Sequence, residues 1–165
     1  MLSDAEIASR LEFHEGRRAE AYYCSGGYLT QGIGHNLEMN PLSKEQKSKI
    51  KNLKSWTDSE INMVLSDDVA QCKVLMTQLI RGFENFDDER QYALIDMCFQ
   101  LGARGVSNFK KMLSAMRDGD WDRASAECLD SKYAKKDTPT RAKRIAYLIK
   151  TGQWEKDIEK IEEAL

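Results

Sequence analysis

The sequence predicts an α+β fold that is predominantly α. A small N-terminal lobe with a short antiparallel sheet, a long connecting helix and a helical C-terminal lobe are expected. The strand-forming residues and most of the nearby glycines are confined to 17–35. A helical pattern of about 20 residues begins at Thr57. From Asp87 onward the sequence pattern is helical. Strands gathered in one part of a chain and helices in the other are typical of an α+β architecture. We expect a single domain, 1–165, with the small lobe at 1–56, the connecting helix at 57–80 and the helical lobe at 81–165.

The first helix is predicted to begin after Ser3 and to end at Glu15. Ser3 and Glu6 have the spacing of a capping box, in which each side chain binds the other residue's backbone N–H. Gly16 follows the last helical residue, where a left-handed glycine commonly ends a helix. The next segment, with its tyrosines and glycines, predicts a small antiparallel sheet with a turn at Ser25-Gly26-Gly27.

The long helix carries its own start signal, a second capping box formed by Thr57 and Glu60. Its apolar residues recur at helical spacing and define one face. The residues on this face are Ile61, Val64, Leu65, Cys72, Leu75, Met76 and Leu79. Breaks in the helical text that follows are expected at Gly102, Gly105, Gly119, Pro139 and Gly152.

Charge and hydropathy exclude several classes of protein. Lys and Arg total 25 against 27 for Asp and Glu, so the net charge is -2. A dedicated nucleic-acid binder usually carries a strong basic excess. No apolar run approaches the roughly 18 residues that span a bilayer, and the N-terminal residues are acidic and lack the pattern of a secretory signal. We expect a cytoplasmic protein that binds neither nucleic acid nor membrane stably.

The four cysteines, Cys24, Cys72, Cys98 and Cys128, lie singly in the sequence, and their spacing gives no sign of a disulfide framework. Three of them sit in apolar helical text and are expected to be small buried hydrophobic residues. Cys24 differs, because it precedes the glycine-rich turn.

Glu15 is a candidate general acid. The unsatisfied carbonyl groups at a helix C-terminus disfavour negative charge, and a carboxyl held in its protonated form can donate a proton. An ordinary surface glutamate is the alternative on position alone. The hairpin after this helix could turn Glu15, Cys24 and Thr30 toward one side of a cleft, although Thr30 is equally explained as a strand former.

At this point the sequence resembles a known family. The segments Leu11–Gly16 and Gly27–His35, with Tyr22 between them, resemble the N-terminal signature of the phage-type lysozymes, glycoside hydrolase family 24. Four later blocks resemble the family's motifs in the same order, and together they span Leu11 to Trp154. They are Cys98–Gly102 with Gly105–Phe109, Asp120–Asp122, Thr138–Arg144 and Thr151–Trp154.

The resemblance implies a lysozyme-like fold and a role for each matching residue. Glu15 takes the position of the general acid, and Thr30 that of the threonine that positions the attacking water. The position between them, usually Asp, is Cys24 here, which gives a Glu/Cys/Thr triad. Arg141 matches the arginine that lies near the acid across the cleft and is counted with the substrate-binding residues.

The resemblance also implies a saccharide-binding groove and a structural ion pair. Gly34, Asn36, Phe99 and Gln100 match positions that line the groove, and Asn36 replaces a common leucine. Met112 and Glu127 stand where uncharged polar contacts are usual. His35 is expected to pair with Asp68 on the long helix, and no metal or cofactor is expected.

The expected function is that of an endolysin-like muramidase, a monomer that cleaves the β-1,4 bond between N-acetylmuramic acid and N-acetylglucosamine in bacterial peptidoglycan. It would leave the cytoplasm through a pore or a secretion apparatus. Two alternatives stay open: a cysteine-dependent amidase or peptidase with Cys24 as nucleophile and His35 as base, and an inactive wall-binding module. The basic stretch from Lys132 to Lys150 could steer the protein toward an anionic wall or could simply be a solvated face.

Overall fold

The computed structural model describes all 165 residues, and they form two compact units. The N-terminal unit is Ser3–Gln71, and the C-terminal unit is Met1–Leu2 with Cys72–Leu165. The boundary falls inside the long helix α3 (Asp58–Leu79) rather than at either end of it. The predominantly α, α+β fold class is confirmed.

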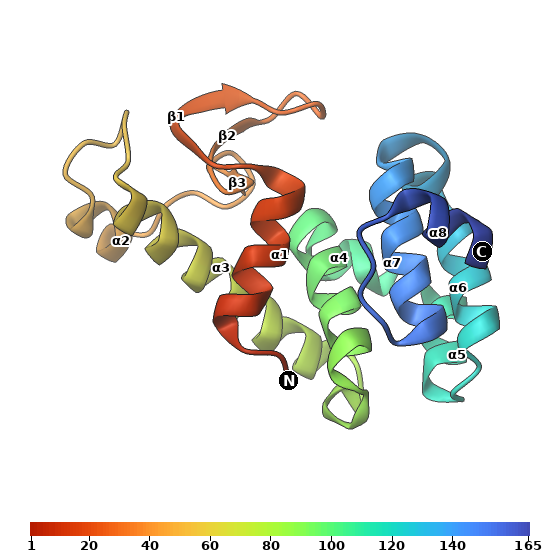
Figure 1. Cartoon of the computed structure of the whole chain (residues 1–165). Helices are drawn as coiled ribbons and strands as arrows, with labels where there is room; N and C mark the ends of the chain where they lie inside the picture. Colours follow the sequence, from red (N-terminus) through yellow and green to blue (C-terminus); the bar gives the residue numbers. More distant parts are fainter. The chain divides into compact units, whose positions relative to one another are not determined.

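The N-terminal unit contains the sheet and three helical segments (Figure 1). Its elements are α1 (Asp4–Glu15), β1 (Arg18–Tyr23), β2 (Leu29–Gly32), β3 (His35–Asn36), α2 (Lys44–Lys49) and the first part of α3. The three strands are antiparallel in the order β1-β2-β3, which confirms the predicted sheet.

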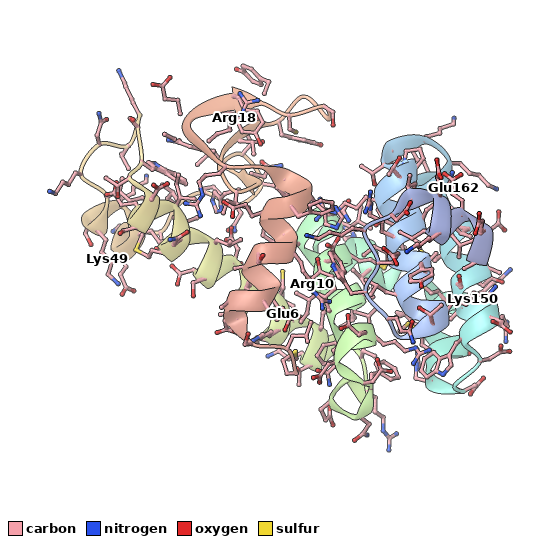
Figure 2. The ribbon with its side chains drawn as sticks, viewed as in Figure 1. Glu6, Arg10, Arg18, Lys49, Lys150 and Glu162 are labelled. Carbon is pink, nitrogen blue, oxygen red and sulfur yellow. The ribbon has the colours of Figure 1, made fainter.

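Helix α1 begins and ends as predicted. The Ser3 hydroxyl accepts a hydrogen bond from the Glu6 N–H at 3.2 Å, and the left-handed Gly16 closes the other end. The Glu6 carboxylate does not return the bond to complete a capping box. It accepts from Arg10 one turn later at 2.9 Å instead, and Figure 2 shows both side chains on α1.

Helix α3 has the full capping box that the sequence predicts. The Glu60 N–H donates to the Thr57 hydroxyl, and the Thr57 N–H donates to the Glu60 carboxylate. Most of the predicted apolar face is buried, but Leu79 is 40% exposed and its assignment to that face was wrong. The helix ends at Leu79, and the buried position four residues after Met76 belongs to Ile80.

One short helix of the N-terminal unit has no counterpart in the sequence prediction. Helix α2 buries none of its residues and therefore has no apolar face to reveal it. Its only signal is the capping box between Ser43 and Gln46.

The C-terminal unit is helical. After a 3₁₀ turn at Phe83–Asn85 it contains α4 (Asp88–Ser107), α5 (Lys110–Arg117), α6 (Trp121–Leu129), a π-helical turn (Tyr133–Asp137), α7 (Pro139–Thr151) and α8 (Ile158–Ala164). Helix α7 lies among α4, α6 and α8 and contacts all three (Figure 1). Gly102 interrupts α4 as predicted, whereas Gly105 stays helical and the break predicted there was wrong. None of the helices combines the length and apolar character that crossing a bilayer requires.

Candidate active site

Glu15 is the last residue of α1, and its carboxyl group lies against the backbone of Gly34. A Cβ atom at Gly34 would lie 2.7 Å from the Glu15 carboxyl carbon and 2.8 Å from its Oε2. Gly34 also has a φ of +60°, a conformation that disfavours side chains. Both facts require glycine here. The family resemblance predicted that Gly34 lines the saccharide groove. The structure shows that its backbone lies against the carboxyl group of Glu15, the candidate acid.

The hairpin between β1 and β2 positions Cys24. The Cys24 N–H donates to the Tyr28 carbonyl at 3.0 Å, and the Gly27 N–H donates to the Cys24 carbonyl at 2.9 Å. These bonds close a three-residue loop, Ser25-Gly26-Gly27, in which Gly27 has the positive φ that such loops need at their last position. The predicted turn is confirmed, and it fixes the backbone on both sides of the thiol.

The hairpin favours the ionised form of Cys24. Burial raises the pKa of the thiol, but hydrogen bonds from the backbone N–H of Tyr28, the Thr30 hydroxyl and the backbone N–H groups of Gly26 and Gly27 outweigh it, so the pKa lies below its ordinary value. Successive N–H groups that converge on one atom form a site for an anion. Cys24 is half-buried and carries a free thiol, so reagents and substrate can reach it.

Thr30 is buried and offers its hydroxyl to two acceptors. Its Oγ1 donates to the Tyr28 carbonyl at 2.9 Å and also lies within hydrogen-bonding reach of the Cys24 sulfur. A hydroxyl has one proton to donate. Ionisation of Cys24 therefore creates a charged acceptor that competes with the Tyr28 carbonyl for this proton.

Three side chains form a row across the sheet. Thr30 on the central strand β2 lies opposite Tyr22 on β1 and opposite Asn36 on β3. Residues directly opposite one another in antiparallel strands point to the same face of the sheet. The Asn36 Oδ1 accepts from the backbone N–H groups of Glu38 and Met39 at 3.0 and 2.9 Å, so this oxygen holds the turn after β3.

The predicted pair of His35 and Asp68 is present. His35 Nδ1 lies 2.7 Å from the Asp68 carboxylate, and its Nε2 lies 2.8 Å from the Asn40 carbonyl. Asn40 also donates its side-chain amide to Asp68 at 3.2 Å. His35 is buried and both of its nitrogens are engaged, which leaves neither nitrogen available as a base for Cys24.

The C-terminal unit gathers Gln100 and Arg141 around a carboxylate that the sequence analysis missed. Asp96 is fully buried and accepts hydrogen bonds from Tyr92, Gln100 and Arg141 at 2.8, 2.8 and 3.0 Å. Gln100 also bonds to the hydroxyl of Tyr133. Tyr92, Asp96 and Gln100 follow one another at i, i+4 on α4. This spacing within the apolar middle part of the helix was the signal that could have revealed Asp96.

Comparison with known proteins decides the family. The sequence model of the Phage lysozyme family matches residues 12–148. The chain belongs to the phage lysozyme family. It is therefore a glycoside hydrolase of the lysozyme type.

Individual family members are about one-third identical to this chain. The pre-baseplate central spike protein Gp5 of Enterobacteria phage T4 is 33% identical over 90% of this chain, which spans only 28% of that protein. Probable T4-type lysozymes 1 and 2 of Dictyostelium discoideum are 31% and 29% identical, again over 90% of this chain and over 95% of each relative.

In this phage lysozyme family member two cavities lie outside the residues 15–30 that carry Glu15, Cys24 and Thr30. One, of about 340 Å³, is polar and lies between α2 and α3, with Asp67 and Asp68 in its wall. The other, of about 530 Å³, lies in the C-terminal unit, and Met112 and Glu127 line it. The family resemblance led us to expect uncharged polar residues at these two positions.

The basic stretch of the C-terminal unit is largely neutralised within the protein. Lys135 pairs with Asp130 at 2.6 Å, and Lys143 pairs with Glu162 at 3.1 Å. Lys150 donates to the Ala164 carbonyl at 2.9 Å. Figure 2 shows Lys150 on α7 and Glu162 on α8, the neighbouring helix. These contacts favour the interpretation of a solvated, internally paired face over that of a steering surface.

No group of three or more His, Cys, Asp or Glu side chains is placed to hold a metal ion. The residues of the candidate site that the sequence analysis missed are Tyr22 and Asp96. Tyr22 was noted only as part of a family motif, although its cross-strand position beside Thr30 places it within the site.

Proposed function

We propose that this chain is a muramidase, which hydrolyses the β-1,4 bond between N-acetylmuramic acid and N-acetylglucosamine in bacterial peptidoglycan. The observation that supports it most is the hairpin after α1, which holds a thiol with a lowered pKa and a buried hydroxyl only a few residues from Glu15. An acid and a group able to accept a proton from water are what hydrolysis of a glycoside needs.

Glu15 acts as the general acid in this mechanism. Its carboxyl proton moves to the glycosidic oxygen as the bond between that oxygen and the anomeric carbon breaks. Contact with the Gly34 backbone holds the carboxyl group in one place, so proton donation does not first require ordering of a flexible side chain.

Cys24 acts as the base. Its thiolate takes a proton from the water that attacks the anomeric carbon, and Thr30 helps to hold that water. The N–H groups of the hairpin stabilise the thiolate before the reaction. Attack by water on the face opposite the leaving group inverts the anomeric configuration. Direct attack by the sulfur would instead retain it, so the anomer of the product separates the two roles.

Five residues are proposed to bind the saccharide. In the N-terminal unit they are Gly34 and Asn36, and in the C-terminal unit they are Phe99, Gln100 and Arg141. The Asp96 carboxylate orients two of them, since it accepts from both Gln100 and Arg141.

Product analysis tests the function. Purified peptidoglycan is digested with the chain and with its Glu15→Gln variant, and new reducing ends and new free amines are measured separately. Reducing ends that depend on Glu15, with N-acetylmuramic acid at the new terminus, support the muramidase. New amines without reducing ends would mean an amidase or peptidase. Binding without either product would mean a wall-binding module.

A further inference from the structure

Tyr22 lies among the three residues of the proposed triad. It is half-buried on β1 and directly opposite Thr30. Cys24 lies two residues further along the chain, and positions i and i+2 of an extended strand face the same side. Burial raises the pKa of the Tyr22 phenol, and the nearby charges of Glu15 and Cys24 raise it further against the opposing charge of Arg18.

The surroundings of Tyr22 fix its ring and leave its hydroxyl available. The Arg18 guanidinium lies 4.8 Å from the centre of the ring, and Figure 2 shows Arg18 on the same strand. A cation over an aromatic face holds the ring in place. The phenol oxygen of Tyr22 makes no hydrogen bond within the protein. By contrast, the Thr30 hydroxyl and the backbone N–H groups of Cys24 and Leu29 in the same hairpin all donate hydrogen bonds.

A neutral hydroxyl among potential anions has a definite chemical use. Because the pKa of Tyr22 is raised and that of Cys24 is lowered, the phenol keeps its proton and acts as a donor where Cys24 changes its charge. A saccharide presents hydroxyl, ring and glycosidic oxygens, all of which accept hydrogen bonds. A donor beside both the acid and the thiol meets the sugar at the bond that is cleaved.

We propose that Tyr22 is a further catalytic residue, whose hydroxyl donates a hydrogen bond to an oxygen of the bound saccharide at the cleaved linkage. The inference rests on the proposed glycosidase function. In this role the Tyr22 hydroxyl binds the substrate through a hydrogen bond and does not transfer its proton.

The test compares Tyr22→Phe with Tyr23→Phe. The control residue is the next residue of β1 and is 73% exposed, so its hydroxyl faces solvent. Release of reducing ends from solubilised peptidoglycan glycan strands is measured against pH, together with melting temperature. Tyr22→Phe keeps the ring and its contact with Arg18, and is expected to lower kcat/KM about tenfold through the loss of one hydrogen bond. Its melting temperature and the shape of its pH profile should match those of Tyr23→Phe.

Each outcome decides a separate point. If the unaltered chain releases no reducing ends, the muramidase function fails and the role of Tyr22 falls with it. If the unaltered chain is active and the two variants are equally active, Tyr22 has no such contact, and the function stands. Loss of one limb of the pH profile in Tyr22→Phe would mean that the phenol transfers a proton, which also overturns the proposed contact.

A measurement that keeps Tyr22 in place covers the case in which Tyr22→Phe folds poorly. The Glu15→Gln chain is iodinated with and without saturating glycan strands, and the modified tyrosines are identified by peptide mass spectrometry. Glycan is expected to protect Tyr22 at least fivefold and to leave Tyr23 unprotected. Equal modification of Tyr22 in the presence and absence of glycan would overturn the proposal.

Discussion

The carboxyl group of Glu15 occupies the space that a side chain at Gly34 would need. A Cβ atom there would lie 2.7 Å from both the Cγ and the Cδ of Glu15. Real carbon atoms do not approach so closely, and the contact involves the two atoms that set the direction of the carboxyl group. The identity of residue 34 therefore controls where the proposed acid points.

Gly34→Ala is expected to lower activity about 100-fold, because displacing a catalytic group by about 1 Å has an effect of this size. Gly119→Ala is the matched control, since Gly119 has a φ of +70° and open space where its Cβ would lie. Both variants should lose about 1–2 kcal/mol of stability from backbone strain. Equal activity of the two variants would show that the Glu15 carboxyl is not held by Gly34.

Glu15→Gln is expected to keep the fold and to lose activity by about 10²–10⁴-fold, because an amide cannot donate the required proton. Glu20→Gln, an exposed position on β1, serves as the control for the change of charge. Lysis of permeabilised Gram-negative cells is followed by turbidity. More than about a tenth of the original rate in Glu15→Gln would exclude Glu15 as the general acid.

Activity is expected to depend on the ionisation of Cys24. The thiolate is the active form of Cys24, so on the acidic limb of the pH profile the rate is lost as the pH falls through the pKa of Cys24. Because the hairpin lowers this pKa, the rise should come at a lower pH than for an ordinary thiol. Cys24→Ala should be nearly inactive. Cys24→Asp should keep substantial activity and move the rise to still lower pH, because a carboxylate ionises there.

Cys24→Ala with unchanged activity would contradict the triad and would leave Glu15 and Thr30 to act alone. The anomeric form of the product, measured by NMR early in the reaction, gives the role of the sulfur. An inverted product is expected for a base, and a retained product would indicate a nucleophile.

The four thiols are expected to react at very different rates in the folded chain. Cys24 is half-buried with a lowered pKa, whereas burial raises the pKa of Cys128 to about 12. Iodoacetamide at neutral pH should modify Cys24 first and abolish activity in step with that modification, because the thiolate is the nucleophile. Unfolding in denaturant should make all four thiols reactive. Full activity after modification of Cys24 would exclude a role for its sulfur.

Asp68→Asn is expected to lower stability by about 1–3 kcal/mol, because a buried, charge-assisted hydrogen bond to His35 is lost. The neighbouring Asp67→Asn is the control, since Asp67 is exposed and bonds only to Gln46 in an equally exposed contact. The melting temperature of both variants is measured at one pH, about 6. The rate per folded molecule should change little. A large loss of rate with unchanged melting would indicate a catalytic role for His35.

The sequence predicted most of the fold because its signals are local. Capping residues mark the starts of α1 and α3, and the glycines mark the hairpin. Helix α2 was missed because it has no buried face. Leu79 was assigned to the apolar face of α3 because periodicity alone does not show where a helix ends.

The sequence named candidate site residues but did not predict the contacts around them. Glu15, Cys24 and Thr30 could be named from a motif, but the hydrogen bonds that stabilise a thiolate are main-chain bonds and depend on the conformation of the loop. The helix spacing of Asp96 is present in the sequence, but its bond to Arg141 and the strand register that places Tyr22 opposite Thr30 appear only in the folded chain.

The donors that surround Cys24 are mostly main-chain N–H groups, which every amino acid except proline supplies. The exposed side chain of Ser25 can therefore change without removing any of them. Insertion or deletion of a single residue in the loop would redirect all of them at once, because hairpin register depends on loop length. Evolution of this enzyme is thus free to vary Ser25 but is constrained in the length of the loop and at Gly27, which has a positive φ.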